Sequence, residues 1–113
     1  MCAAGAQPSK KPRDPMIYQK VDHIKMGIDG LISKIQRQSQ FLPTRDEVET
    51  FAVQINDVIM KNRDKVRSFE SYLKAAIIDL TEVPEMHAEM QRISFLTALK
   101  DASQKLQLFL ESC

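Results

Sequence analysis

The sequence predicts an all-α protein: an up-down-up antiparallel bundle of three helices over residues 16–113, behind a disordered N-terminal tail, 1–15. Apolar residues recur with a 3.5-residue period along three long stretches, which is typical of helices that pack seam to seam. Prolines separate these stretches, and the tail holds three prolines and no apolar period. With three glycines in 113 residues, the chain also lacks the tight turns of a β-sandwich.

The stretch 45–81 carries the clearest seam, in alternating steps of four and three residues. The seam positions are Val48, Ala52, Ile55, Ile59, Asn62, Val66, Phe69, Leu73, Ala76 and Leu80. Nine of these ten residues are apolar, and Asn62 is the exception. A polar residue on a coiled-coil seam can set register or partner choice. Asn62 is therefore either such a determinant or a local imperfection that turns toward solvent.

The length of this middle helix is its unusual feature. A single helix over 45–81 would be about 55 Å long, against about 37–40 Å for each of its neighbours. Either one end projects from the bundle, or the helix breaks in the polar run 61–65 and gives four helices. We expect an unbroken helix, because the apolar period stays in phase across Asn62 and a loop usually shifts it.

The first helix is expected to begin near Pro15 and to end at Leu42, before Pro43. Its seam holds Ile17, Val21, Ile24, Ile28, Leu31, Ile35, Gln38 and Leu42. Gly27 and Gly30 lie in its interior, where each costs about 1 kcal/mol relative to alanine. Two glycines within one turn indicate a close approach by another helix. The alternative is that packing simply tolerates them.

The turn into the middle helix has the most specific local signal. Thr44 is followed three residues later by Glu47, which is the spacing of a capping box. In that motif the threonine oxygen accepts one unpaired backbone N–H, and the glutamate accepts another. Leu42, two residues before Thr44, and Val48 are expected to pack on each other as the matching hydrophobic staple.

The third helix is expected over 85–112 and is apolar over a broader arc than the others. Its seam is Leu96, Leu99, Ser103, Leu106 and Leu110, preceded by Met86, Met90 and Ile93. A second stripe beside it holds Phe95, Ala98, Ala102 and Phe109, with Leu108 further round. Phe95, Leu108 and Phe109 form either a surplus apolar patch that binds a partner or part of a complete core. Met86 and Met90 could likewise line an adaptable binding surface or plug one end of the bundle.

Composition excludes several functional classes. The net charge of +1 lacks the basic excess that is usual in nucleic-acid-binding domains. The basic residues of the tail are a weak tether or import patch, or simply part of a solvated leader. No apolar run is long enough for a membrane span or a secretory signal, so we expect a cytoplasmic or nuclear protein. Cys2 and Cys113 are expected to be free thiols, since neither has a metal-binding or redox spacing.

No constellation of residues suggests catalysis. His23 and His87 are the only histidines, and neither has a second metal ligand one helical turn away. Both are interpreted as surface residues. The Gly-Ile-Asp-Gly sequence at 27–30 lacks the lysine and preceding strand of a phosphate-binding loop. We expect no enzyme activity, no metal, no cofactor and no small-molecule substrate.

Two short segments resemble BAG domains. The Phe-Leu-Pro sequence at 41–43 resembles the first turn of these bundles, and Leu-Gln-Leu-Phe-Leu at 106–110 resembles the end of their third helix. These co-chaperones bind the ATPase domain of the seventy-kilodalton heat-shock chaperones through basic residues and a glutamine. The resemblance implies that Gln107 matches that glutamine, although Leu96 and Leu99 stand where arginines would match.

A second resemblance concerns membrane trafficking. The Arg-Ile-Ser-Phe-Leu-Thr sequence at 92–97 is similar to the last helix of the N-terminal three-helix domains of syntaxin-like SNARE proteins. This similarity implies a trafficking bundle.

The residues themselves favour a non-catalytic protein–protein interaction module: a small helical adaptor or a subunit of a larger complex. A BAG-like co-chaperone and a syntaxin-N-terminal-like bundle are the alternatives. The expected partner is another protein, bound through a helix face, and homo-oligomers are compatible with the same seams. The candidate partner-binding residues are Asn62, Phe95, Gln107, Leu108 and Phe109.

Overall fold

The structure, a computed structural model, describes residues 15–112 apart from the side chain of Ser68. These residues are almost entirely helical and include no strand. The elements are α1 (Pro15–Arg37), α2 (Arg45–Lys61), α3 (Arg63–Val66), the 3₁₀ turn η1 (Arg67–Phe69), α4 (Glu70–Thr81) and α5 (Ala88–Glu111). The expectations for the tail and for both cysteines fall outside the described residues.

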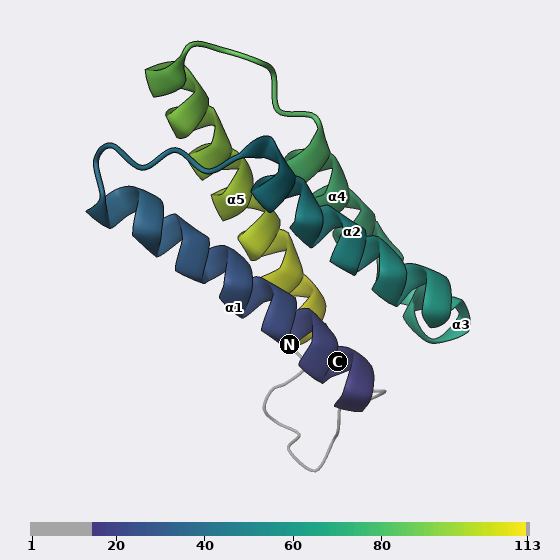
Figure 1. Ribbon diagram of the computed structural model, residues 1–113. Coiled ribbons are helices and arrows are strands. Elements are labelled where there is room, and N and C mark those ends of the chain that lie inside the picture. The colour runs from purple at the N-terminus through teal and green to yellow at the C-terminus, as the bar shows by residue number, and fades with distance from the viewer. Residues whose placement is uncertain (1–14, 113) are drawn as a thin grey trace.

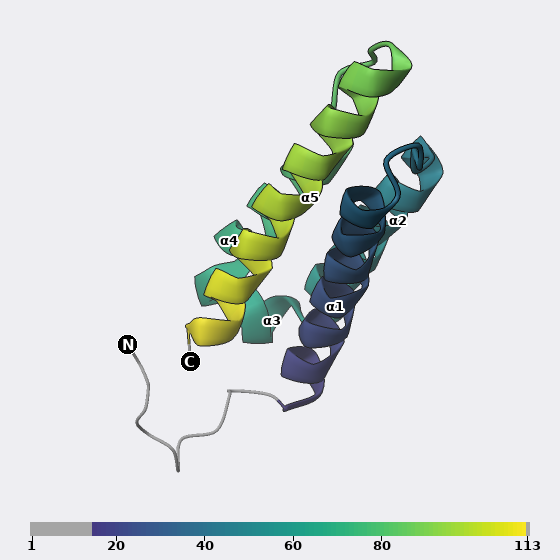
Figure 2. The same cartoon turned by 90° about the vertical axis from the view of Figure 1, so that its left-hand side faces the viewer.

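The four longer helices form an up-down-up-down antiparallel bundle (Figure 1). Around the bundle the order is α1, α2, α4, α5, because α1 packs on α2 and α5, and α4 packs on the same two helices. The pair α1 and α2 therefore forms one side, and the pair α4 and α5 forms the opposite side (Figure 2). The short α3 and η1 make the turn between α2 and α4 at one end.

The unbroken helix over 45–81 is wrong, and with it the three-helix bundle. The chain breaks at Asn62, in the polar run given above as the alternative, and reverses before α4. Asn62 leaves helical geometry, with φ, ψ of −133°, 36°, and the backbone departs again from the regular α-helix at the last residues of α3 and η1, Val66 (−105°, 0°) and Phe69 (−126°, 12°). Single helical turns separate these three residues. The reversal therefore keeps the apolar period in phase, which is why the period gave no sign of it.

The core consists of the predicted seams. In the middle stretch every seam residue is buried except Asn62 and Phe69, which are partly exposed. In α1 the buried residues are Ile17, Val21, Ile24, Ile28 and Ile35. The seam of the middle stretch is thus confirmed although the helix breaks, because burial follows the local apolar period whether or not the helix continues. The other two seams are wrong at one end each, where five predicted residues are exposed: Gln38 and Leu42 after α1, and Met86, Met90 and Ile93 before or at the start of α5.

Both loops depart by a few residues from the predicted boundaries. The helix α1 ends at Arg37 rather than Leu42, and α5 begins at Ala88 rather than Glu85. The capping box of α2 is confirmed: the Glu47 amide donates to Thr44 Oγ1 at 3.0 Å, and the Thr44 amide donates to Glu47 Oε1 at 2.8 Å. The start of α2 could be predicted because the two residues of the capping box are close to each other in the sequence.

Polar links tie α5 to its two neighbours. Ser103 Oγ donates to Asp29 Oδ1 of α1 at 2.5 Å, and Lys105 Nζ pairs with Asp79 Oδ2 of α4 at 2.5 Å. Arg92 Nη2 donates to the carbonyl of Ile35 in the last turn of α1, at 2.6 Å. These links add to the packing of α5 on both α1 and α4.

Candidate functional site

The least closely packed pair of neighbouring helices is α1 with α2, on the side that faces the viewer in Figure 1. Between the first half of α1 and the second half of α2 lies a groove of about 560 Å³. We call it the α1–α2 groove. Its lining residues are Met16, Gln19, Lys20, His23 and Ile24 of α1 with Val53, Gln54, Asp57 and Val58 of α2.

The groove has an apolar floor and an apolar residue on each rim. Ile24 and Val58 form the floor and belong to the buried core. Met16 and Val53 lie on opposite helices, and each is about two-thirds exposed, at 65% and 67%. Large apolar side chains exposed beside an apolar hollow are typical of a surface that is covered by a partner.

The polar side chains of the groove carry opposite charge on its two walls. The α1 wall holds Lys20 and His23, and the α2 wall holds Asp57. Within residues 15–112, Lys20 and His23 make no hydrogen bond or ion pair, whereas Asp57 pairs with Lys61 of its own helix at 3.4 Å. The α1 wall therefore offers a ligand the unpaired cation of Lys20 beside the imidazole of His23, and the α2 wall offers a carboxylate that already pairs with a lysine.

Gly27 follows Ile24 by one helical turn and lies outside the lining of the groove. A Cβ atom on Gly27 would lie 2.9 Å from Cε1 of Phe51, so the missing side chain lets the aromatic ring lie against the α1 backbone. Gly30 has nothing within 4 Å of such a Cβ, and a second hollow of about 380 Å³ opens beside it. At Gly27 the close approach is made by one aromatic ring of α2, while α1 and α2 stay the least closely packed neighbours, and at Gly30 the predicted approach is wrong.

The predicted site residues do not form one surface. Phe95 and Phe109 are core residues at 3% and 6% exposure, so the surplus apolar patch does not form and the complete-core alternative holds for them. Leu108 is partly exposed, and the exposed Gln107 donates from Nε2 to Glu111 Oε2 at 2.8 Å. Gln107 and Leu108 are accessible to a partner, and partner binding by these two residues stays a prediction.

Asn62 has a local structural role. Its Nδ2 donates to the carbonyl of Val58 at 2.9 Å, and its own carbonyl accepts from the amides of Lys65 and Val66. The side chain thus gives the Val58 carbonyl a second donor beside the Asn62 amide, which lies 3.1 Å from the same oxygen, and the carbonyl of Asn62 starts α3. A register role on a continuous seam does not apply, because that seam is interrupted at this residue.

The sequence reasoning missed the α1–α2 groove. Met16 and Val53 lie off both seams, and isolated surface apolar residues are common, so neither was informative alone. The only usable signal was Gly27, which indicated a close approach on this face of the first helix.

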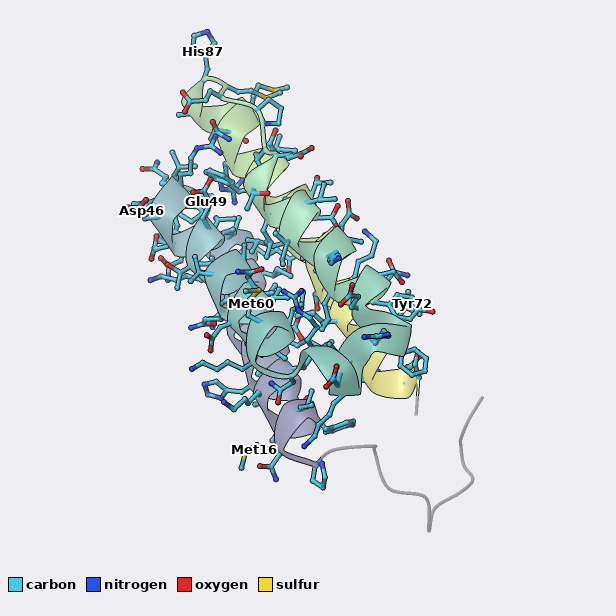
Figure 3. The ribbon with its side chains drawn as sticks, turned by 90° about the vertical axis from the view of Figure 1, so that its right-hand side faces the viewer. Met16, Asp46, Glu49, Met60, Tyr72 and His87 are labelled. Carbon is cyan, nitrogen blue, oxygen red and sulfur yellow. The ribbon has the colours of Figure 1, made fainter. Side chains whose placement is uncertain are left out.

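Both histidines are exposed, as predicted. His23 lines the groove, and His87 is the N-cap residue of α5, without a side-chain capping bond, and projects from the end of the bundle (Figure 3). Among the described residues, no three His, Cys, Asp or Glu side chains come close enough to hold a metal ion. None of the helices in this range has the length and apolar character needed to cross a bilayer.

Comparison of the chain with protein-family models, curated proteins and solved structures gave no match. The similarities to BAG domains and to syntaxin-like bundles therefore rest on the short segments quoted above. The geometry of the bundle carries the functional argument.

Proposed function

We propose that this chain is a non-catalytic protein–protein interaction module, a small helical adaptor or complex subunit, that binds an amphipathic helix of a partner in the α1–α2 groove. The observation that supports this proposal is the pair of exposed apolar rims, Met16 and Val53, over the apolar floor of the most loosely packed side. A helix laid along this side would cover both rims and contact both walls, as in other helix-in-groove complexes.

The charges of the walls specify the partner helix further. An acidic residue on its edge next to α1 would pair with Lys20 or His23, which are unpaired within the described chain. A basic residue on its other edge would approach Asp57. Such rim charges set orientation and association rate more than affinity.

The expected affinity is modest. Complete burial of a large apolar side chain contributes about 1.5–3 kcal/mol, so covering the exposed two-thirds of Met16 and Val53 gives about 2–4 kcal/mol in total. A dissociation constant of about 1 μM needs about 8 kcal/mol after the cost of association. The partner's own apolar residues must supply the remainder, and we expect micromolar or weaker, reversible binding.

The test is a selection of amphipathic helical peptides from a library, followed by mapping of the bound site by NMR. Selected helices should shift the methyl signals of Met16, Ile24 and Val53, and Met16→Lys should abolish binding. The matched control is Met26→Lys, because Met26 lies on the same helix, outside the groove, with a similar exposure of 63%. Helices that bind Met16→Lys as well as the unchanged chain would contradict the proposal.

A further inference from the structure

The side of the bundle opposite the α1–α2 groove carries a second hollow, of about 400 Å³, between the end of α4 and the first half of α5. Ile78 of α4 and Ile93 of α5 lie on its two sides and are 51% and 46% exposed. Val83 and Pro84 line the end of the hollow where the chain passes from α4 to α5. We call this surface the α4–α5 hollow.

The two methionines singled out in the sequence extend the α4–α5 hollow. Met90 is exposed one helical turn before Ile93, and Met86 is exposed next to Ser94, whose Oγ lies 3.2 Å from its sulfur. Neither methionine plugs the end of the bundle. Flexible, polarisable methionine side chains are frequent on surfaces that adapt to helical ligands.

The charge on this surface has one sign. Three carboxylates line the α4–α5 hollow, from Asp79, Glu82 and Asp101, and none of its lining residues is a lysine or arginine. Asp79 is neutralised by Lys105. Glu82 and Asp101 form no ion pair with any residue of 15–112, so their charges are free to act on a ligand.

We infer that the α4–α5 hollow is a second docking surface, and that its ligand is a basic amphipathic helix of another protein. The exposed isoleucines and methionines match an apolar stripe, and the unpaired carboxylates match lysines or arginines beside that stripe. The same carboxylates repel nucleic acids and anionic membranes. This inference does not depend on the α1–α2 groove, since the two surfaces share no residue.

Two synthetic peptides of about 18 residues, about 27 Å long as helices, serve as probes. Both carry the same leucine stripe, flanked by lysines in one peptide and by glutamates in the other. Titrated against the full chain at low salt, the lysine peptide should shift the methyl signals of Ile78, Ile93 and Met90, and the glutamate peptide should not bind. The affinity of the lysine peptide should fall as the salt concentration rises, because screening weakens exposed charge pairs.

The decisive variant is Glu82→Gln/Asp101→Asn, which removes both unpaired charges with little change of shape. We expect it to weaken binding of the lysine peptide by about ten-fold and to reduce the salt dependence. The control Asp46→Asn/Asp64→Asn removes two exposed charges elsewhere and should change affinity less than about two-fold, given that distant exposed charges are screened. Ile93→Gln tests the apolar contact of the hollow: it should weaken binding of the lysine peptide, and its control Met26→Gln should not.

Three outcomes would overturn the inference. The lysine peptide could fail to bind, or it could shift signals of the α1–α2 groove instead. The third outcome is that both charge variants weaken binding of the lysine peptide equally, which would indicate a general electrostatic attraction and no specific site. Shifts of the Ile78 and Ile93 signals with protein concentration alone would make a second copy of this chain the occupant. Thermal unfolding of each variant, followed by circular dichroism, separates a lost site from a lost fold.

Discussion

The two glycines of α1 give the sharpest test of the packing, because the same substitution should have opposite consequences three residues apart. Both lie in regular helix with no positive φ, so alanine fits the backbone at either position. In an exposed helix interior, glycine to alanine stabilises by about 1 kcal/mol. Gly30 has nothing within 4 Å of the new methyl group, so Gly30→Ala should yield that full amount.

At Gly27 the new methyl group would lie 2.9 Å from the ring of Phe51, which must move. Phe51 is half-buried and packs on the core, and complete loss of a buried phenylalanine costs about 3–5 kcal/mol. Displacing part of such a ring should cost roughly 1–2 kcal/mol by the same scale. The helix-propensity gain is cancelled, and we expect Gly27→Ala to be neutral or to destabilise by up to about 1 kcal/mol.

The assay is urea unfolding followed by circular dichroism, with the slope checked for constancy. The two variants should differ by at least about 1 kcal/mol, which corresponds to about 4–8 °C in Tm for a domain of this size. Phe51→Leu in the Gly27→Ala background should cost less than it does alone, because the ring that clashes has been removed. Equal stabilisation by both alanines would refute the close approach of Phe51 to α1.

Three further results are expected. Thr44→Ala should lower the free energy of unfolding by about 1 kcal/mol in the same urea assay, through loss of the capping box, and an unchanged value would contradict it. Asn62→Leu should destabilise by about 1 kcal/mol, since it removes the bond to Val58, whereas a higher Tm would indicate the continuous helix. If the chain is a BAG-like co-chaperone, it should retain a heat-shock ATPase domain in a pull-down, and Gln107→Ala should weaken that retention; no retention would remove this alternative.

The parts of the fold that could be predicted are those with local causes. The capping box at Thr44 needs only residues three apart, and the seams need only the period of the apolar residues. The reversal at Asn62 has no such signature. It contains neither glycine nor proline. The residues at which its backbone departs from the regular α-helix lie on the seam itself, so the apolar period is the same for this turn as for a continuous helix.

The candidate surfaces were beyond sequence reasoning for a different reason. A groove depends on how closely two helices pack, and that distance is set by contacts such as Phe51 on Gly27, which join residues far apart in the chain. For Met86 and Met90 the sequence left two alternatives, a binding surface or a plug. Both are exposed, Met86 in the loop before α5 and Met90 in the first turn of α5, and this exposure removes the plug.

The chain reversal also changes where a partner is to be sought. As a single long helix, 45–81 would have offered a projecting seam around Asn62. Folded back, its second half becomes α4 and fills the core from within, as the burial of Leu73 and Leu80 shows. The two hollows that are flanked by exposed apolar residues then lie on opposite sides of the bundle, one with mixed charge and one acidic. Two surfaces of different chemistry on opposite sides suit an adaptor that holds two partners at once better than they suit a module with one ligand.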